Sequence, residues 1–232
     1  MKGPLYSLVI PLYNEEKQAS LVIKKILDYF SDDLELILVN NGSRDNTERI
    51  IDSFRGRARK VSFSDNQGYG GGIISGLRKA RGEFIGFTTG GGQVMPESIL
   101  KVFEEARKNP NSVCKAKRMQ RESLFRRFTS YGYNFLANAI FFVRLTDING
   151  HPVVLEKKVF DELGLQTKDF MINIELYIKA KKRGMRIIQV RIPYYKRMGG
   201  SRSHVTLLTV VQMFRELIAF RRKLSMYMEG SR

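Results

Sequence analysis

Cysteine, histidine and long hydrophobic runs are all scarce in this sequence of 232 residues. The single cysteine, Cys114, cannot form an internal disulfide, and the two histidines, His151 and His204, are too far apart for a zinc-finger spacing. The longest apolar stretch, Phe135–Val143, is much shorter than the roughly 18 residues that a membrane-spanning helix needs. The first residues also lack the basic and apolar pattern of a secretion signal. We therefore expect a cytoplasmic protein without a transmembrane helix, in which Cys114 is an apolar strand residue.

Acidic residues are outnumbered, since 23 Asp and Glu stand against 40 Lys and Arg and leave a formal net charge of +17. Such an excess predicts affinity for polyanions: nucleic acid, anionic lipid headgroups or phosphorylated small molecules. The sequence shows no helix-turn-helix, RNA-recognition motif or zinc knuckle, so we expect no nucleic-acid partner. With 43% hydrophobic and 27% charged residues, the chain has the composition of a folded globular protein.

Apolar strand-like segments alternate with segments of helical periodicity through the first half of the chain. The expected strands are Tyr6–Leu12, Leu34–Val39, Val61–Ser64 and Phe84–Thr88, and the helices that follow them are Leu21–Phe30, Thr47–Phe54, Gly70–Ala80 and Glu97–Lys108. Four such units in succession predict a parallel sheet. Because the strand at Leu36–Val39 is apolar at every position, helices should cover both faces. The expected fold class is therefore α/β, with a doubly wound, mostly parallel sheet.

The second half of the chain is less regular. A basic stretch, Lys115–Arg127, precedes the apolar segment Phe128–Val143, and a helix at Asn173–Lys182 and a strand at Arg186–Ile192 are expected after them. The tail has an apolar stripe at helical spacing with basic neighbours, which suits either a helix docked on the core or one lying on a lipid surface. We divide the chain into a domain at 1–203 and an amphipathic helix with a basic tail at 204–232.

Polar and glycine residues concentrate in the four loops that follow the expected strands. Ligands of parallel sheets bind beyond the carboxyl ends of the strands. Any one of these loops is also explained by turn and helix-cap requirements, but four along one edge indicate a ligand site. The glycine-rich loop lacks the lysine of a P-loop, and the first strand-to-helix turn lacks the glycines of a dinucleotide fingerprint. The loops are Tyr13–Glu16, Asn40–Asp45, Asn66–Gly72 and Thr88–Gln93.

These loop sequences, taken together and in order, resemble the family 2 glycosyltransferases of the GT-A fold. Within that family the chain is most similar to dolichyl-phosphate mannose synthases and bacterial polyprenyl-phosphate sugar transferases. The resemblance covers roughly residues 5–203 and is carried by several ordered motifs. These are Val9–Glu16, Val39–Thr47, Asn66–Gly68, Ala80–Glu83, Asp147–His151, Ile174–Glu175 and Arg197–Arg202.

The resemblance implies inverting transfer of a sugar from a GDP- or UDP-linked donor to an acceptor, often a polyprenyl phosphate. Arginines would stabilise the departing diphosphate, and the candidates are Arg118, Arg197 and Arg202. A phosphate acceptor needs no general base, whereas a hydroxyl acceptor would need Asp147 or Glu175. Glu175 is alternatively a helix-surface residue paired with Lys179. The residues matching donor-binding positions are Pro11, Tyr13, Asn14, Glu15, Asn40, Asn41, Gly42, Ser43, Gly68, Thr89, Gly90, Gly91 and Gln93, and Gly68 would let the backbone come close to the ligand.

The sequence departs from the family at its metal motif, Asp-x-Asp with a later Gln, where this chain reads Thr89-Gly90-Gly91-Gly92-Gln93. Threonine and glutamine are poor ligands for Mg²⁺ or Mn²⁺, so a conventional divalent-metal site is not expected. The usual Asp-Asp of the nucleoside loop is likewise Asn40-Asn41. Two explanations stay open. Backbone N–H groups and arginines could bind the diphosphate directly, or the protein could be a catalytically silent member that binds a nucleotide sugar or a partner.

A lipid-linked acceptor would require contact with an anionic membrane surface. The basic stretch and the apolar segment after it are suited to this, with cations at the headgroups and aromatic rings just below them. Packing of Phe141 and Phe142 under the sheet is an equal alternative. We thus expect either a protein bound peripherally to the inner face of the membrane or one whose aromatic residues belong to its core.

Overall fold

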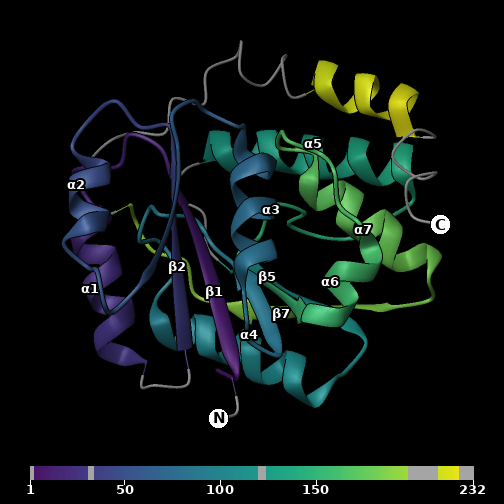
Figure 1. Cartoon of the computed structure of the whole chain (residues 1–232). Coiled ribbons are helices and arrows are strands. Elements are labelled where there is room, and N and C mark those ends of the chain that lie inside the picture. The colour runs from purple at the N-terminus through teal and green to yellow at the C-terminus, as the bar shows by residue number, and fades with distance from the viewer. Residues whose placement is uncertain (1–2, 31–33, 120–123, 198–213, 225–232) are drawn as a thin grey trace.

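A seven-stranded sheet organises the chain, and its strand order is β3-β2-β1-β4-β6-β5-β7. The computed structural model describes residues 3–30, 34–119, 124–197 and 214–224 (Figure 1). Neighbouring strands are parallel except at β6, which is antiparallel to both β4 and β5. The strands are β1 (Tyr6–Leu12), β2 (Leu34–Asn41), β3 (Arg59–Phe63), β4 (Phe84–Phe87), β5 (Ser112–Arg118), β6 (Val153–Glu156) and β7 (Arg186–Ile192).

Helices cover both faces of the sheet. One face packs against α1 (Ala19–Tyr29), α2 (Thr47–Asp52) and α4 (Pro96–Lys108). The other packs against α3 (Tyr69–Lys79), α5 (Leu124–Phe141), α6 (Lys157–Leu163) and α7 (Ile172–Lys182). Figure 1 shows α1 and α2 together at the left and α5, α6 and α7 together at the right.

The alternating strands and helices of the first half confirm the predicted parallel, doubly wound arrangement. Successive side chains of β1 explain the two-sided core, because Leu8 and Ile10 pack into one cluster and Val9 into the other. The sequence did not predict β6 or α6. Cys114 is confirmed as an apolar strand residue, since it is fully buried in β5 and burial raises the pKa of its thiol to about 11.

The C-terminal helix, residues 214–224, is docked on the domain. Leu217 and Phe220 are buried in the same core cluster as α5, and the Phe220 ring lies 5.8 Å from that of Phe141. Core docking is therefore confirmed for this part of the tail. The apolar residues before it, and the proposed boundary at 203/204, lie outside the described residues. No helix in the described part of the chain is long and apolar enough to cross a bilayer.

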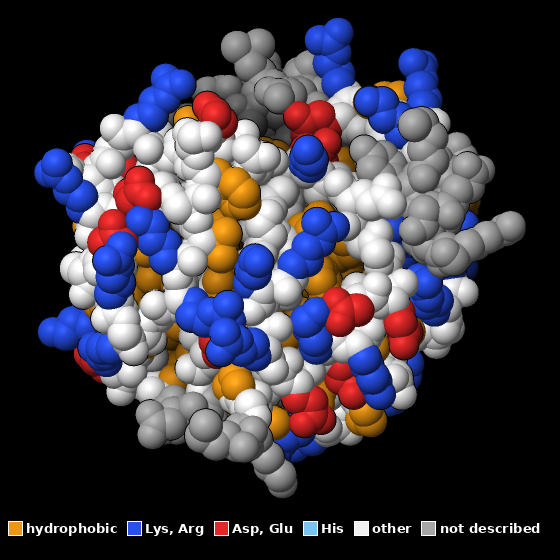
Figure 2. Space-filling view, in the orientation of Figure 1, with side chains coloured by type: hydrophobic (Ala, Val, Ile, Leu, Met, Phe, Trp, Pro, Cys, Tyr) orange, Lys and Arg blue, Asp and Glu red, His pale blue; other side chains and the backbone are white. Residues whose placement is uncertain are grey.

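Lysine and arginine are spread widely over the surface rather than confined to one patch. Figure 2 shows them over the whole of the face viewed, with fewer acidic groups and some hydrophobic side chains between them. The net charge of +17 therefore does not locate the site by itself. The loops at the carboxyl ends of the strands have to be used to locate the ligand site.

Gly76 tests how closely α3 packs on the sheet. A Cβ at this position would lie 2.3 Å from Val9 Cγ1 and 3.0 Å from Val39 Cγ2. We expect Gly76→Ala to lower the free energy of unfolding by about 1–3 kcal/mol, because stiff β-branched side chains cannot move aside cheaply. Chemical denaturation measures this change in the free energy of unfolding. The matched control is Gly132→Ala in α5, whose Cβ would meet nothing closer than 4.0 Å, so the variant should be as stable as the parent or more so. Equal destabilisation by both substitutions would contradict the packing described.

Candidate active site

The first two loops of the carboxyl edge are joined by hydrogen bonds. Asn14 donates its backbone N–H to Ser43 Oγ at 3.2 Å, and its side-chain Oδ1 accepts from Arg44 N at 2.8 Å. Glu15 donates its backbone N–H to Thr47 Oγ1 at 2.8 Å. Pro11 is half-buried near the end of β1, and Tyr13 beyond it is exposed. The predicted donor-binding residues of these two loops are thus brought together in space.

Asn40 and Asn41 direct their side chains into the protein. Asn40 Oδ1 accepts from Ser43 N at 3.1 Å, and its Nδ2 donates to Ser62 Oγ. Asn41 Nδ2 donates to Gly68 O at 3.0 Å, and its Oδ1 accepts from Gln67 N. Both residues are almost completely buried. These amides hold the loops in place, so we leave them out of the proposed donor contacts.

Gly42 and Gly68 make their close approaches to the protein's own backbone. Gly68 has a φ of +77°, and a Cβ there would lie 2.3 Å from Lys168 O. Gly42 has a φ of +75°, and a Cβ would lie 2.5 Å from the carbonyl carbon of Asp65. The expectation that Gly68 also lets the backbone approach a ligand stays a prediction. The glycine is needed because the loop before α7 packs against this turn.

The loop after β4 lies between the end of β1 and the segment after β7. A Cβ on Gly90 would lie 2.4 Å from Leu12 Cδ2, and one on Gly91 would lie 3.7 Å from Arg197 Cζ. Gln93 accepts a hydrogen bond from Tyr195 N at its backbone oxygen, at 3.0 Å. Thr89, beside Gly90, is half-buried. The loop predicted to replace the metal motif is thus in contact with a cation.

That cation forms an ion pair across the edge. Arg197 Nη2 donates to both carboxylate oxygens of Glu15. Glu15 and Arg197 keep 18% and 25% of their side chains exposed. Arg197 Nε is buried and has no hydrogen-bond partner among the residues that the structure describes. Two residues predicted from separate motifs therefore meet at one point. Arg202, the third arginine predicted, lies outside the described residues.

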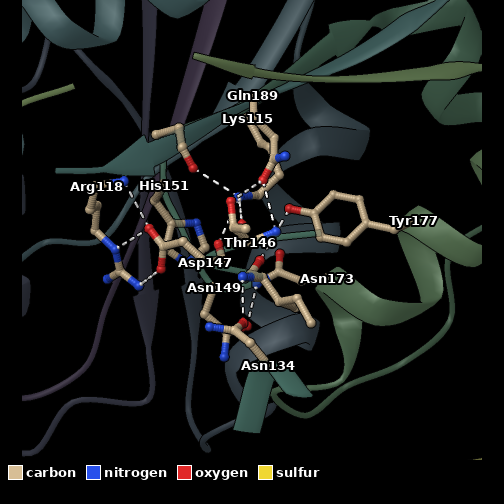
Figure 3. Close-up of polar contacts among 12 residues, drawn as sticks. Lys115, Arg118, Asn134, Thr146, Asp147, Asn149, His151, Asn173, Tyr177 and Gln189 are labelled. Atoms are coloured by element: carbon tan, nitrogen blue, oxygen red, sulfur yellow. Dashed lines mark hydrogen bonds and ion pairs between the residues drawn. The ribbon is translucent and has the colours of Figure 1, made fainter. Parts of the chain in front are cut away.

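Arg118 and Asp147 form a second, more buried ion pair (Figure 3). Asp147 Oδ2 accepts from Arg118 Nε at 2.8 Å and from Arg118 N at 2.9 Å, and Oδ1 accepts from Nη2. Burial alone would lower the pKa of Arg118, but the hydrogen bonds and the charge of Asp147, together with Tyr194, outweigh burial and raise that pKa. The guanidinium also lies 5.0 Å from the centre of the Tyr194 ring. The two residues predicted as charge stabiliser and base bind each other.

The segment that carries Asp147 is held from several sides, as Figure 3 shows. Lys115 Nζ donates to Asp147 O at 2.7 Å and to Ala116 O at 2.8 Å. Ile148 N donates to Asn134 Oδ1 at 2.9 Å, and Asn173 donates to Asn149 Oδ1 at 3.0 Å. Lys115, the first residue of the predicted basic stretch, is fully buried and therefore does not reach the surface. No signal in the sequence separates it from the more exposed basic residues of that stretch.

His151 ends this segment and was not predicted as a site residue. Its Nε2 lies 3.0 Å from the Tyr69 hydroxyl, and its Nδ1 is buried and finds no hydrogen-bond partner in the described ranges of the chain. Burial, assisted by the charges of Arg118 and Lys115, lowers the pKa of His151 to about 3. The imidazole is therefore neutral at physiological pH and is not poised to exchange a proton there.

Glu175 is completely buried in α7 and pairs with Lys179, also completely buried, at 2.8 Å. Its carboxylate accepts from the backbone N–H groups of Gln166 and Thr167, and Lys179 donates to Gly164 O. The predicted pairing with Lys179 is present, but it lies in the core instead of on a helix surface. These contacts give Glu175 a structural role in fixing the loop that packs on Gly68, so we leave it out of the proposed site.

The family assignment follows from comparison with known proteins. The sequence model of the family described as Glycosyl transferase family 2 matches residues 7–164, which is more than half of the chain. The chain belongs to this family. Among curated proteins, this family 2 member is 34% identical to the uncharacterized glycosyltransferase EpsJ of Bacillus subtilis, over 46% of this chain and 31% of that protein.

A second relative of this family 2 chain carries a more specific name. It is an undecaprenyl-phosphate 4-deoxy-4-formamido-L-arabinose transferase of Shewanella sediminis, 30% identical over 61% of this chain and 45% of that protein. The chain spans between 31% and 51% of the length of these relatives and of a further Bacillus subtilis glycosyltransferase, YkcC.

Solved structures show the fold. Glucosyl-3-phosphoglycerate synthase from Mycobacterium tuberculosis, in complex with Mn²⁺, UDP-glucose and phosphoglyceric acid, superposes with a TM-score of 0.74. The match covers 94% of this chain and 78% of that chain at 20% identity. The seven-stranded, mostly parallel sheet with helices on both faces is therefore the GT-A fold, as the resemblance implied.

The residues of this family 2 member do not fit a divalent metal at the usual place. The loop after β4 offers threonine, glycine and glutamine, and the neighbouring carboxylate, Glu15, is bound to Arg197. Within the described part of the chain, no three His, Cys, Asp or Glu residues are grouped so that they could hold a metal ion. Hard cations favour anionic oxygen ligands, whereas this position has a guanidinium.

The structural role of Glu175 is tested by its substitution. We expect Glu175→Gln to lower the free energy of unfolding by about 3–5 kcal/mol, because it leaves the Lys179 ammonium uncompensated in the core. The matched control is Asp161→Asn, which breaks another i,i+4 ion pair, that of Lys157 and Asp161, where Asp161 is 56% exposed. It should change stability by less than about 0.5 kcal/mol. Similar losses for both variants in denaturant titrations would argue against the buried pair.

Proposed function

We propose that this protein transfers a sugar from a nucleotide diphosphate donor to the phosphate of a polyprenyl lipid, with inversion at the anomeric carbon. The observation that carries the proposal is the Arg197 guanidinium beside Gly91, at the carboxyl edge where parallel sheets bind ligands. Two kinds of likeness support the substrates. The solved neighbour holds UDP-glucose, and the Shewanella sediminis relative is named for undecaprenyl phosphate.

The chemistry needs few groups from the protein. An oxygen of the acceptor phosphate attacks the anomeric carbon, the bond from that carbon to the diphosphate oxygen breaks, and its electron pair leaves with the nucleoside diphosphate. The acceptor requires no general base because the second pKa of a phosphate monoester is about 6. Charge grows on the leaving diphosphate, and Arg197 is placed to stabilise it by paired N–H donors. Asp147 stays with Arg118, which positions the segment between β5 and β6.

The donor site proposed here works without a divalent metal. A guanidinium and a diphosphate match in charge and geometry, and the glycines of the loop after β4 leave their N–H groups free of side-chain cover. Adding a carboxylate to this loop would therefore weaken binding of the donor diphosphate, because the carboxylate would compete for Arg197. The alternative explanation, a catalytically silent member, differs by predicting donor binding without turnover.

Calorimetry of donor binding tests this. We expect a UDP- or GDP-linked sugar to bind equally well in EDTA and in millimolar Mn²⁺ or Mg²⁺. We also expect Gly91→Asp to weaken binding by about tenfold or more, because its carboxylate would meet Arg197 and compete with the diphosphate. The matched control is Gly91→Asn, which adds similar volume without charge.

Donor binding that appears only with the metal would remove the metal-free site. Binding of no donor under either condition would remove the enzymatic proposal as a whole. A loss caused equally by Gly91→Asn and Gly91→Asp would show that volume, and not charge, is responsible.

The acceptor and the membrane meet the protein, we propose, at the outer face of α5. Tyr131 and Phe135, about 40° apart around the helix, are 72% and 66% exposed, and Phe142 just after it is 73% exposed. Phe141, by contrast, is buried, so packing in the core is confirmed for Phe141, whereas Phe142 is exposed and its contact with lipid stays a prediction. Large exposed aromatics in a row suit the interfacial layer of a bilayer.

Cations flank these rings. Lys181 Nζ lies 3.4 Å from Phe142 O, and burial together with the nearby charge of Arg144 lowers the pKa of Lys181. The docked C-terminal helix adds exposed basic residues on the same side as α5: Arg215, Arg221, Arg222 and Lys223. Aromatic rings with surrounding cations complement an anionic leaflet.

Sedimentation with lipid vesicles tests the surface. We expect binding to vesicles containing anionic lipid, and at least about tenfold weaker binding by Tyr131→Ser combined with Phe135→Ser, because two rings no longer enter the interface. The control pair is Leu21→Ser with Tyr29→Ser on α1, which removes two large exposed apolar side chains elsewhere on the surface. If the control pair reduced binding as much, or if the parent ignored anionic lipid, the surface would be wrongly placed.

A further inference from the structure

The Glu15–Arg197 pair joins two parts of the chain that are 182 residues apart in sequence. Glu15 lies on the loop after β1, just before α1, and Arg197 lies five residues after β7 ends. One guanidinium nitrogen serves both carboxylate oxygens. The pair therefore bridges the donor edge at the place where the proposed function puts the diphosphate.

Both partners are held by their backbones. Glu15 N donates to Thr47 Oγ1, and Glu15 O accepts from Gln18 and Ala19 at the start of α1. On the other side, the backbone N–H of Tyr195, which precedes Arg197 by two residues, donates to Gln93 O. The carboxylate is thus an anion fixed at the edge, and only side-chain rotation is needed to separate it from the guanidinium.

One donor of Arg197, its Nε, is buried and makes no hydrogen bond within the described part of the chain. The Gly91 backbone lies alongside this side chain. Carboxylates and phosphates both bind guanidinium groups through two parallel hydrogen bonds. A bidentate anion that used Nε as well as Nη2 would satisfy this donor and would have to take the place of Glu15.

We propose that Glu15 is an internal anion that occupies Arg197 until the donor diphosphate displaces it. This rests on the proposed function, and it makes Glu15 a competitor of the donor instead of a nucleoside contact. The apparent association constant for a diphosphate is then the intrinsic association constant multiplied by the fraction of molecules in which the Glu15–Arg197 pair is open. Glu15 consequently sets the donor concentration that the site requires.

The sign of one substitution separates these two roles. Glu15→Gln keeps the size of the side chain but removes its charge, so Arg197 is released. We expect inorganic pyrophosphate, which has no nucleoside, to bind about three- to tenfold more tightly to Glu15→Gln than to the parent in EDTA. If Glu15 served the nucleoside, the same variant would bind pyrophosphate unchanged and UDP or GDP more weakly.

Glu16→Gln is the matched control. Glu16 is the neighbouring carboxylate, and its Oε2 accepts hydrogen bonds from Asn46 N and Nδ2 at 3.0 Å. A glutamine side-chain oxygen can accept the same two bonds. The Glu16→Gln variant changes the net charge by the same amount as Glu15→Gln, but Glu16 is not bonded to Arg197. Pyrophosphate affinity should be unchanged in this variant, and an equal gain in both variants would overturn the proposal by showing a general charge effect.

Stability supplies a second readout. Glu15→Gln removes an ion pair, so its melting temperature should fall slightly while its pyrophosphate affinity rises, whereas a merely structural residue would lower both. Unchanged or weaker pyrophosphate binding by Glu15→Gln, with a parent that binds donor, overturns the competition and leaves the proposed function standing. Failure of the parent to bind pyrophosphate or any nucleotide sugar removes both.

A tryptophan reporter follows the same exchange by fluorescence. The chain has no tryptophan, so Tyr195→Trp places a single indole at an exposed position two residues from Arg197. Binding of pyrophosphate should change the emission of this indole. Adding Glu15→Gln should move the midpoint of the pyrophosphate titration to a lower pyrophosphate concentration, by the same factor as in calorimetry. An unmoved midpoint would contradict the displacement of Glu15.

Discussion

A guanidinium beside a glycine constrains what this carboxyl edge can bind. Gly91 has no side chain, and Arg197 lies close enough to contact any that was added. Positive charge at this point excludes a cation and favours an anion. The protein's own Glu15 already meets that demand in the structure. The edge is thus built to exchange one anion for another.

The surrounding loops owe their shape to hydrogen bonds that leave few of their polar side chains for a ligand. Asn41 binds the turn at Gly68, that turn packs on the loop before α7, and Glu175 fixes the same loop from within the core. The segment carrying Asp147 is held in a similar way by Lys115 and Arg118. Buried charges of this kind are costly unless they are paired, and Glu175 and Lys179 each bind backbone groups as well as each other. Rigid loops then leave the exchange to the side chains of Glu15 and Arg197.

The fold could be predicted largely from the sequence, and the site only in part. Strands with a continuous apolar run, such as Leu36–Val39 in β2, each followed by a helix, specified the parallel half of the sheet. The antiparallel strand β6, which lies between β4 and β5 in the sheet, was not predicted. Its four residues are all buried and give no periodic signal of their own. Motif order identified the family and placed Glu15 and Arg197 in one site, but it did not show that they bind each other. The roles of Asn41, Gly68, Lys115 and Glu175 depend on partners that only folding brings together.

Diffraction from crystals soaked with a nucleotide sugar and Mn²⁺, measured with anomalous scattering at the manganese edge, shows which group binds the diphosphate. We expect the diphosphate to be bonded to Arg197, Glu15 to be released from Arg197, and no anomalous peak to lie between the diphosphate and Gln93. A manganese peak there, coordinated by the diphosphate while Glu15 and Arg197 remain paired, would contradict this expectation.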